Sequence, residues 1–149
     1  MSYARIMKIL QETEAYKDLD VPVVLSGGDL GIYFINTEKT MQDGGAWNEF
    51  KNDATGMTSH AIKVMFENQN FADVIEYLTE KADELLKGED RSLCMISGGQ
   101  TRDWPFSAGV ASQLDLPHLA LYKQKPGEED KLEIIDGDEV RPVDEKDKE

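Results

Sequence analysis

The segment 97–103 combines residue types that suit anion binding. It reads Ser-Gly-Gly-Gln-Thr-Arg-Asp and follows an apolar run. Gly98 and Gly99 would let backbone N–H groups approach an anion closely, and a following helix would add a partial positive charge. Arg102 offers a guanidinium that can donate to two phosphate oxygens at once. The alternative is that the glycines make a tight turn and Arg102 pairs with Asp103 or with the acidic surface.

Two lysines follow the next apolar run along the chain, and they could act with Arg102. Lys123 and Lys125 come directly after the expected strand 117–122. If this strand is parallel to the expected strand 92–96, both leave the sheet at the same edge, where open α/β sheets bind ligands. Three positive groups would then converge there. Alternatively, both lysines are exposed residues at a strand end, where lysine also protects a sheet edge.

A third candidate group lies near the start of the chain. Tyr33 and Phe34 are adjacent in an expected strand, so their rings point to opposite sides and one could be exposed. An exposed ring beside the ammonium of Lys39 could stack on a planar anionic base. The alternative is that both rings pack in the core.

Other chemistries find little support in the sequence. His60 and His118 are the two histidines, and no metal-ligand spacing is present, so we expect no metal site formed by side chains. Cys94 lies in an apolar run, as expected for a small core residue rather than a nucleophile. Trp47 and Trp104 are expected to be packing groups rather than stacking platforms.

Composition narrows the classes of partner. The chain has 149 residues, 40% of them hydrophobic, with 16 Lys+Arg against 30 Asp+Glu and a formal net charge of −14. We expect no nucleic-acid partner, because phosphate backbones require a positive surface, but a small anionic substrate could bind a local basic cluster. The single cysteine and the lack of a run of about 18 apolar residues predict a cytoplasmic protein without a membrane partner.

Hydrophobic periodicity predicts an α/β fold in one domain, 1–149. We expect helices at 2–16, 58–67, 70–87 and 105–114, strands at 21–25, 31–36, 92–96 and 117–122, a loop at 43–57, and a hairpin at 132–140. The strand–helix–strand unit implies parallel pairing with a right-handed crossover. Residues 58–142 would form the core, residues 1–57 a smaller cap, and residues 143–149 an acidic, solvated tail.

The motifs together resemble a known family. The orotate phosphoribosyltransferases and their close relatives have a similar core, and the resemblance rests on residues 97–107, 110–111, 116–118 and 122–123. A looser similarity to the orotate side of that family covers Gly28, residues 33–36 and Lys39. The order and spacing of the two regions agree over most of the chain.

This resemblance implies a type I phosphoribosyltransferase fold: a twisted, mainly parallel sheet flanked by helices, with a small N-terminal hood. It implies the transfer of ribose 5-phosphate from phosphoribosyl pyrophosphate to orotate, a step of pyrimidine biosynthesis, with magnesium (Mg²⁺) bridging oxygens of the donor. It also implies a homodimer whose mobile loops complete each other's sites.

The family's functional positions map onto this chain by their motifs. The resemblance implies that Ser97, Gly98, Gly99, Gln100, Thr101 and Arg102 cradle pyrophosphate. It implies that Lys123 and Lys125 begin the mobile catalytic loop and neutralise the leaving group. It places Tyr33 and Phe34 beside the base, with Lys39 close to them.

Two features depart from the family pattern. The motif of two acids and a Thr/Gly-rich turn, which grips the ribose 5-phosphate, has no counterpart after residues 134–139. Residues 127–149 hold eleven Asp/Glu and four Lys/Arg, so this segment alone has a net charge of −7. The sequence is therefore compatible with the N-terminal part of a longer transferase. The alternative is a non-catalytic nucleotide- or phosphate-binding or regulatory module of the same fold.

Overall fold

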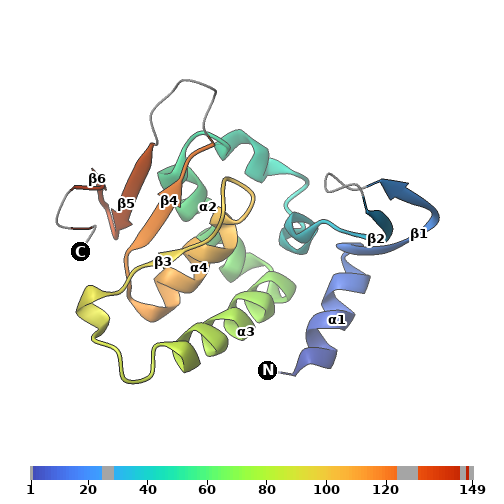
Figure 1. Cartoon of the computed structure of the whole chain (residues 1–149), viewed down its shortest axis with the longest axis horizontal. Helices are drawn as coiled ribbons and strands as arrows, with labels where there is room; N and C mark the ends of the chain where they lie inside the picture. Colours follow the sequence, from blue (N-terminus) through green and yellow to red (C-terminus); the bar gives the residue numbers. More distant parts are fainter. Residues whose placement is uncertain (1, 25–28, 124–130, 145–146, 148–149) are drawn as a thin grey trace.

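The computed structural model describes residues 2–24, 29–123, 131–144 and 147, and it confirms the α/β class (Figure 1). Four α-helices are present in these ranges: α1 (Tyr3–Glu12), α2 (Ala54–Glu67), α3 (Gln69–Leu85) and α4 (Trp104–Leu114). The strands are β1 (Tyr16–Val24), β2 (Leu30–Ile35), β3 (Ile96–Ser97), β4 (His118–Leu121), β5 (Leu132–Asp136) and β6 (Glu139–Pro142). Short 3-10 helices are η1 (Thr37–Met41), η2 (Ala46–Phe50) and η3 (Arg91–Leu93).

The larger sheet has the order β3-β4-β5-β6 and is mixed. β3 and β4 are parallel, but β4–β5 and β5–β6 are antiparallel. The expected mainly parallel sheet is therefore not confirmed. The physical reason is the length of the connection: residues 122–131 are too few for the crossover of about a dozen or more that parallel pairing requires.

Helices α2, α3 and α4 form the core with the larger sheet. α4 packs on β3 and β4 and contacts both α2 and α3. Its sequence is mostly small and apolar, which lets the neighbouring helices approach closely. The buried cluster consists of Met41, Trp47, Ala54, Met57, Ala61, Val64, Phe71, Ile75, Trp104, Val110, Ala120 and Ile135. Trp47 and Trp104 are thus packing groups, as expected.

The N-terminal part forms α1 and a separate hairpin of β1 and β2. The Arg5 guanidinium joins α1 to α3 by donating to Asp73, with Nη2 at 2.8 Å from Oδ2. Burial by itself would raise the pKa of Asp73, but hydrogen bonds from Gln69 and Arg5 outweigh it and leave this pKa below its usual value.

Helix starts differ from expectation where an earlier side chain caps the helix. α2 begins at Ala54 because the Asp53 carboxylate accepts from the Gly56 amide, so part of the expected loop 43–57 is helical. The expected strand 92–96 is reduced to Ile96–Ser97, because residues 91–93 form η3 instead, and Cys94 is half-buried outside a strand. Within the described ranges, no helix is both long and apolar enough to cross a membrane.

The close approach of α3 and α4 depends on Gly109. A Cβ at this position would lie 2.9, 3.1 and 3.2 Å from three side-chain carbons of buried Ile75.

We predict that Gly109→Ala lowers the free energy of unfolding by about 1–3 kcal/mol, because overpacking outweighs the gain in helix propensity. Denaturant unfolding measures this. Adding Ile75→Val, which removes one of the three carbons, should restore part of the loss. A Gly109→Ala protein as stable as the wild type would contradict the packing account.

His118 is buried beneath α4 and predicts how stability depends on pH. Its Nε2 lies 2.9 Å from the Ser107 hydroxyl, and its Nδ1 has no hydrogen-bond partner among the described residues. Burial lowers the pKa of His118 from 6.5 to about 4. The unfolded chain therefore binds this proton more readily, so stability is full above pH 6.5 and falls as the pH drops toward 4, by about 3 kcal/mol.

We predict that His118→Gln, which keeps a polar side chain but does not titrate, removes most of this slope in urea unfolding at pH 4 to 7. The matched variant His60→Gln retains His118 and should keep the slope. Equal slopes in the wild type and His118→Gln would contradict the assignment.

Candidate functional site

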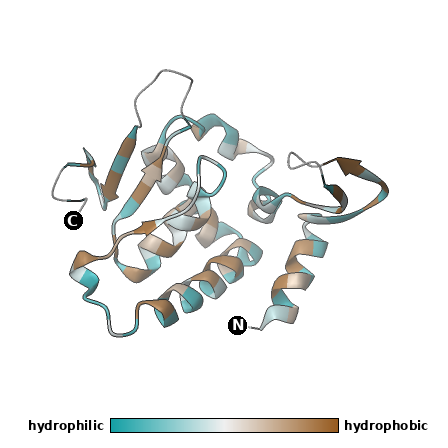
Figure 2. Cartoon of the chain, in the orientation of Figure 1, coloured by the Kyte–Doolittle hydropathy of each residue, from teal (hydrophilic) through white to brown (hydrophobic). Residues whose placement is uncertain are grey.

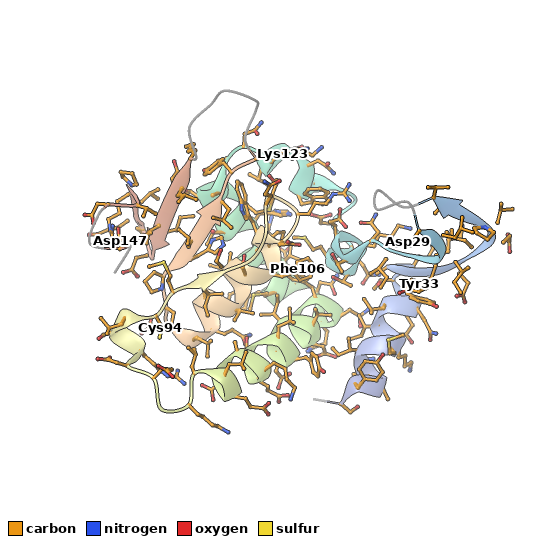
Figure 3. The ribbon with its side chains drawn as sticks, viewed as in Figure 1. Asp29, Tyr33, Cys94, Phe106, Lys123 and Asp147 are labelled. Atoms are coloured by element: carbon orange, nitrogen blue, oxygen red, sulfur yellow. The ribbon has the colours of Figure 1, made fainter. Side chains whose placement is uncertain are left out.

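A cleft of about 530 Å³ opens at the carboxyl end of the parallel strand pair. Three segments far apart in the sequence meet here: the end of η2, the loop before α4, and the residue after Tyr122. Figure 3 labels Lys123 at this edge of the molecule. The lining side chains are Trp47, Lys51, Asn52, Gln100, Thr101, Arg102, Asp103 and Lys123.

The parallel pairing of β3 with β4 explains why two of these segments meet. Ile96 pairs with His118 and Ser97 with Leu119, so both strands run toward the same edge. The loop after β3 and Lys123 after β4 therefore leave the sheet on the same side, as expected from the sequence. Arg102 and Lys123 line one cleft, whereas Lys125 lies outside the described residues.

Lys51 is a third cation in the cleft, and sequence reasoning missed it. It follows η2, in a segment expected to be a loop, and its ammonium lies 5.6 Å from the ring centroid of Trp47. Its carbonyl accepts from the Thr101 hydroxyl at 3.3 Å, which ties this segment to the loop before α4. The segment around Lys51 holds no motif that would have identified it from the sequence.

Trp47 itself is held by the Asp43 carboxylate. Asp43 accepts from the amides of Gly45 and Trp47, each at 2.9 Å, and its Oδ2 lies 2.8 Å from Nε2 of His60 on α2. Gly45 adopts a φ of +88°, which favours glycine at this turn. The network fixes the wall of the cleft on which Lys51 rests.

Arg102 is exposed but not free. Its Nε lies 3.2 Å from Oε1 of Glu38, and the side chains are 69% and 5% exposed respectively. The side-chain amide of Asn36 lies beside the same carboxylate. Arg102 therefore pairs with a buried acid of η1, not with neighbouring Asp103. An anion that binds Arg102 through both guanidinium edges must compete with Glu38.

The two glycines of the loop pack against the start of α4. The Gly99 amide donates to Oδ2 of Asp103 at 3.0 Å, so a carboxylate already occupies this N–H group. A Cβ on Gly98 would come within 2.9 Å of the Asp103 Cβ, and one on Gly99 within 2.3 Å of Oδ2. Close packing against Asp103 and Ser107 therefore favours glycine at both positions. The Ser97 hydroxyl donates to the Leu119 carbonyl at 3.1 Å and does not line the cleft.

Tyr33, one of the expected base-side residues, does not lie in this cleft. Tyr33 stacks on Tyr16 in the hairpin, with ring centroids 5.8 Å apart, and Figure 3 places Tyr33 on a different part of the molecule from Lys123. Phe34 lies on β2 at the register position opposite Lys17. Tyr33 does not line the cleft, and the side chain of Phe34 lies outside what the structure describes.

Lys39 lies in a neighbouring cleft of about 600 Å³, which shares Arg102 and Trp47 with the first. The Lys39 ammonium pairs with Glu14 at 3.3 Å. Glu38 lines this second cleft as well, so the Arg102–Glu38 pair stands between the two.

Lys123 projects from an anchored residue. The preceding Tyr122 packs edge-on against Trp104 at 4.8 Å, donates to the Glu133 carboxylate, and accepts from the Ala54 amide at 3.4 Å. Burial, and after it the hydrogen bond to Glu133, raises the pKa of Tyr122, so the phenol stays protonated. Lys123 thus starts from a fixed backbone.

The side chains do not fit a magnesium ion held by the protein. Across the described ranges, no cluster of three or more His, Cys, Asp or Glu side chains could hold a metal. Among the described residues, Asp103 is the one carboxylate that lines the first cleft, and it already accepts from Gly99. Besides Asp103, the described lining offers three cations and neutral hydrogen-bonding groups, which together suit an anion of two or more charges.

Comparisons of the chain with protein-family models, with curated proteins and with solved structures found no match.

Proposed function

We propose that the chain binds the pyrophosphate group of a phosphorylated sugar in the cleft between η2, the loop before α4, and Lys123. The observation that carries this proposal is the convergence of Lys51, Arg102 and Lys123 on one cleft in a chain with a net charge of −14. On such a surface an anion binds only where a local positive field exceeds the repulsion.

Electrostatic range supports this assignment. At physiological ionic strength charges are screened over about 8 Å, so distant acids weigh little inside a cleft of this size. A hollow walled by protein also concentrates the field of the cations that line it. Gln100, Thr101 and Asn52 add neutral hydrogen-bonding groups, which can bind phosphate oxygens without adding charge.

The finer proposal is an orotate phosphoribosyltransferase-like reaction on a type I phosphoribosyltransferase-like core. The bond from C1 of the ribose to the pyrophosphate oxygen would break, and a bond from C1 to the orotate nitrogen would form, with the proton of that nitrogen released. Lys123, Arg102 and Lys51 would stabilise the negative charge that develops on the leaving pyrophosphate. The parallel unit of β3, α4 and β4, and the second cleft beside Arg102, support this version.

A second candidate, a non-catalytic phosphate- or nucleotide-binding module, also has an observation in its favour. Two of the groups expected to bind pyrophosphate already contact carboxylates. Arg102 pairs with Glu38, and the Gly99 amide donates to Asp103. Such a site binds anions weakly and reversibly, which suits a sensor better than a transferase.

Calorimetric titration tests the anion site. We predict that pyrophosphate, and phosphoribosyl pyrophosphate, bind the wild-type chain, and that Lys123→Met weakens binding about tenfold, because a charge-assisted contact contributes about 1–3 kcal/mol. Lys63→Met is the matched control, since Lys63 is an exposed lysine on α2 that does not line the cleft. Absence of heat at millimolar ligand, or equal losses in both variants, would refute the site.

A product assay separates the two candidates. We predict that the wild-type chain with phosphoribosyl pyrophosphate, orotate and magnesium forms orotidine 5′-phosphate, and that Arg102→Ala lowers the yield. Formation is followed by the change in orotate absorbance. Binding in the calorimeter without product would support the non-catalytic module and contradict the transferase.

Glu38 should limit the affinity of the site. We predict that Glu38→Gln, which keeps the shape of the side chain but removes its charge, tightens pyrophosphate binding several-fold, because Arg102 is released. The control Glu14→Gln removes an exposed acid that pairs with Lys39 instead. Unchanged or weaker binding by a folded Glu38→Gln protein would mean that Arg102 does not receive the anion.

A further inference from the structure

An apolar groove of about 460 Å³ lies between α1, α3 and α4, beside the end of β3. Most of the side chains that line it are apolar, among them two from each helix: Ile6 and Leu10, Val74 and Leu78, Phe106 and Val110. Asp103 is the one charged side chain among the described residues that line this groove. The groove therefore suits an uncharged, apolar group, and the hydroxyl groups of a sugar would find few partners there.

This groove is open to solvent although its walls are apolar. Leu78 is 36% exposed, and Ile6 and Leu10 are half-buried. Figure 2 shows hydrophobic residues interspersed along both α1 and α3. The Arg5 guanidinium holds the two helices beside each other by donating to Asp73. Accessible apolar surface of this kind is typical of a ligand-binding groove.

The groove adjoins the first cleft, where the proposed anion site lies. Asp103 lines both. The loop between β3 and α4 separates them, because residues 97–98 line the groove and residues 100–102 line the cleft. Thr37 lines the groove and directly precedes Glu38, the partner of the arginine in the cleft. A cleft with three cations and an apolar groove thus meet at one loop.

We propose that the first cleft also binds pyrophosphate esters of an apolar alcohol, with the pyrophosphate among its cations and the hydrocarbon tail in the groove. The inference rests on the anion site of the proposed function, not on its sugar or its acceptor. Asp103 sets the orientation, because its carboxylate repels a phosphate group from the groove but does not repel an uncharged tail.

The size of the groove matches a tail of moderate length. A carbon of a hydrocarbon chain takes up about as much space as a water molecule, roughly 30 Å³. A ten-carbon tail then needs roughly 300 Å³, which the 460 Å³ of the groove can hold. The charge of the cleft and the apolar walls of the groove together identify the ligand class, since each matches one end of such an ester.

Calorimetric titration of the wild-type chain with pyrophosphate, isopentenyl pyrophosphate and geranyl pyrophosphate tests the proposal. We expect the ten-carbon geranyl ester to bind about tenfold more tightly than the five-carbon isopentenyl ester, because each methylene removed from water contributes up to about fourfold. Geraniol, which is the same tail without the head, should bind far more weakly than its ester. Equal affinities for pyrophosphate and both esters would overturn this inference and leave the anion site intact. Pyrophosphate that does not bind would refute the anion site, and this inference with it.

Two leucine variants locate the tail. Leu78→Gln puts a polar group in the wall of the groove, so it should remove most of the gain of the ten-carbon ester and leave the affinity for pyrophosphate unchanged. Leu85→Gln is the matched control, because Leu85 lies on the same helix, is 83% exposed and does not line the groove. Lys123→Met should weaken both esters about tenfold and keep their ratio. A gain that survives Leu78→Gln, equal losses in the two leucine variants, or esters unaffected by Lys123→Met would overturn the proposal.

Discussion

The parallel pairing of β3 with β4 is the contact on which the cleft depends. Two register pairs, Ile96 with His118 and Ser97 with Leu119, set the direction of both strands. Because their carboxyl ends share an edge, the loop before α4 meets Lys123, although about twenty residues separate them in the chain. Buried His118 links this pairing to α4 through Ser107, so the same residue that sets the register also couples the sheet to the helix. Beyond β4 the sheet continues with antiparallel strands, which leave this edge unchanged.

Charge inside the site is balanced rather than purely positive. Two of the three cations of the cleft have a local counterpart: Arg102 has Glu38, and Lys51 has the face of Trp47. The Gly99 amide is likewise satisfied by Asp103. Glu38 is the buried carboxylate among these partners, and its pairing with Arg102 compensates the cost of burying it. The consequence is that a bound anion replaces existing interactions, so its net affinity reflects a difference between two sets of contacts.

Sequence patterns predicted the parts of this protein that depend on local periodicity and on strand direction. The helical stripe from Phe71 to Leu85, the Asp136-Gly137 hairpin turn, and the shared edge of Arg102 and Lys123 all follow from such patterns.

The patterns did not predict which side chains would pair with each other. Arg102 pairs with Glu38, more than sixty positions away, and Lys51 enters the cleft from a segment that has no regular periodicity. Long-range contacts of this kind depend on packing that a single sequence does not encode locally. The mainly parallel sheet was inferred from a resemblance, and a short connection after β4 prevents it here.

Titration of the isotope-labelled chain with pyrophosphate, followed by its amide resonances, tests most directly whether an anion binds among Lys51, Arg102 and Lys123. We predict saturable shifts at residues 99–103, 51–52 and 123, with the β1–β2 hairpin and the β5–β6 hairpin unaffected. Shifts that are absent at millimolar pyrophosphate, or that fall outside these three segments, would contradict it.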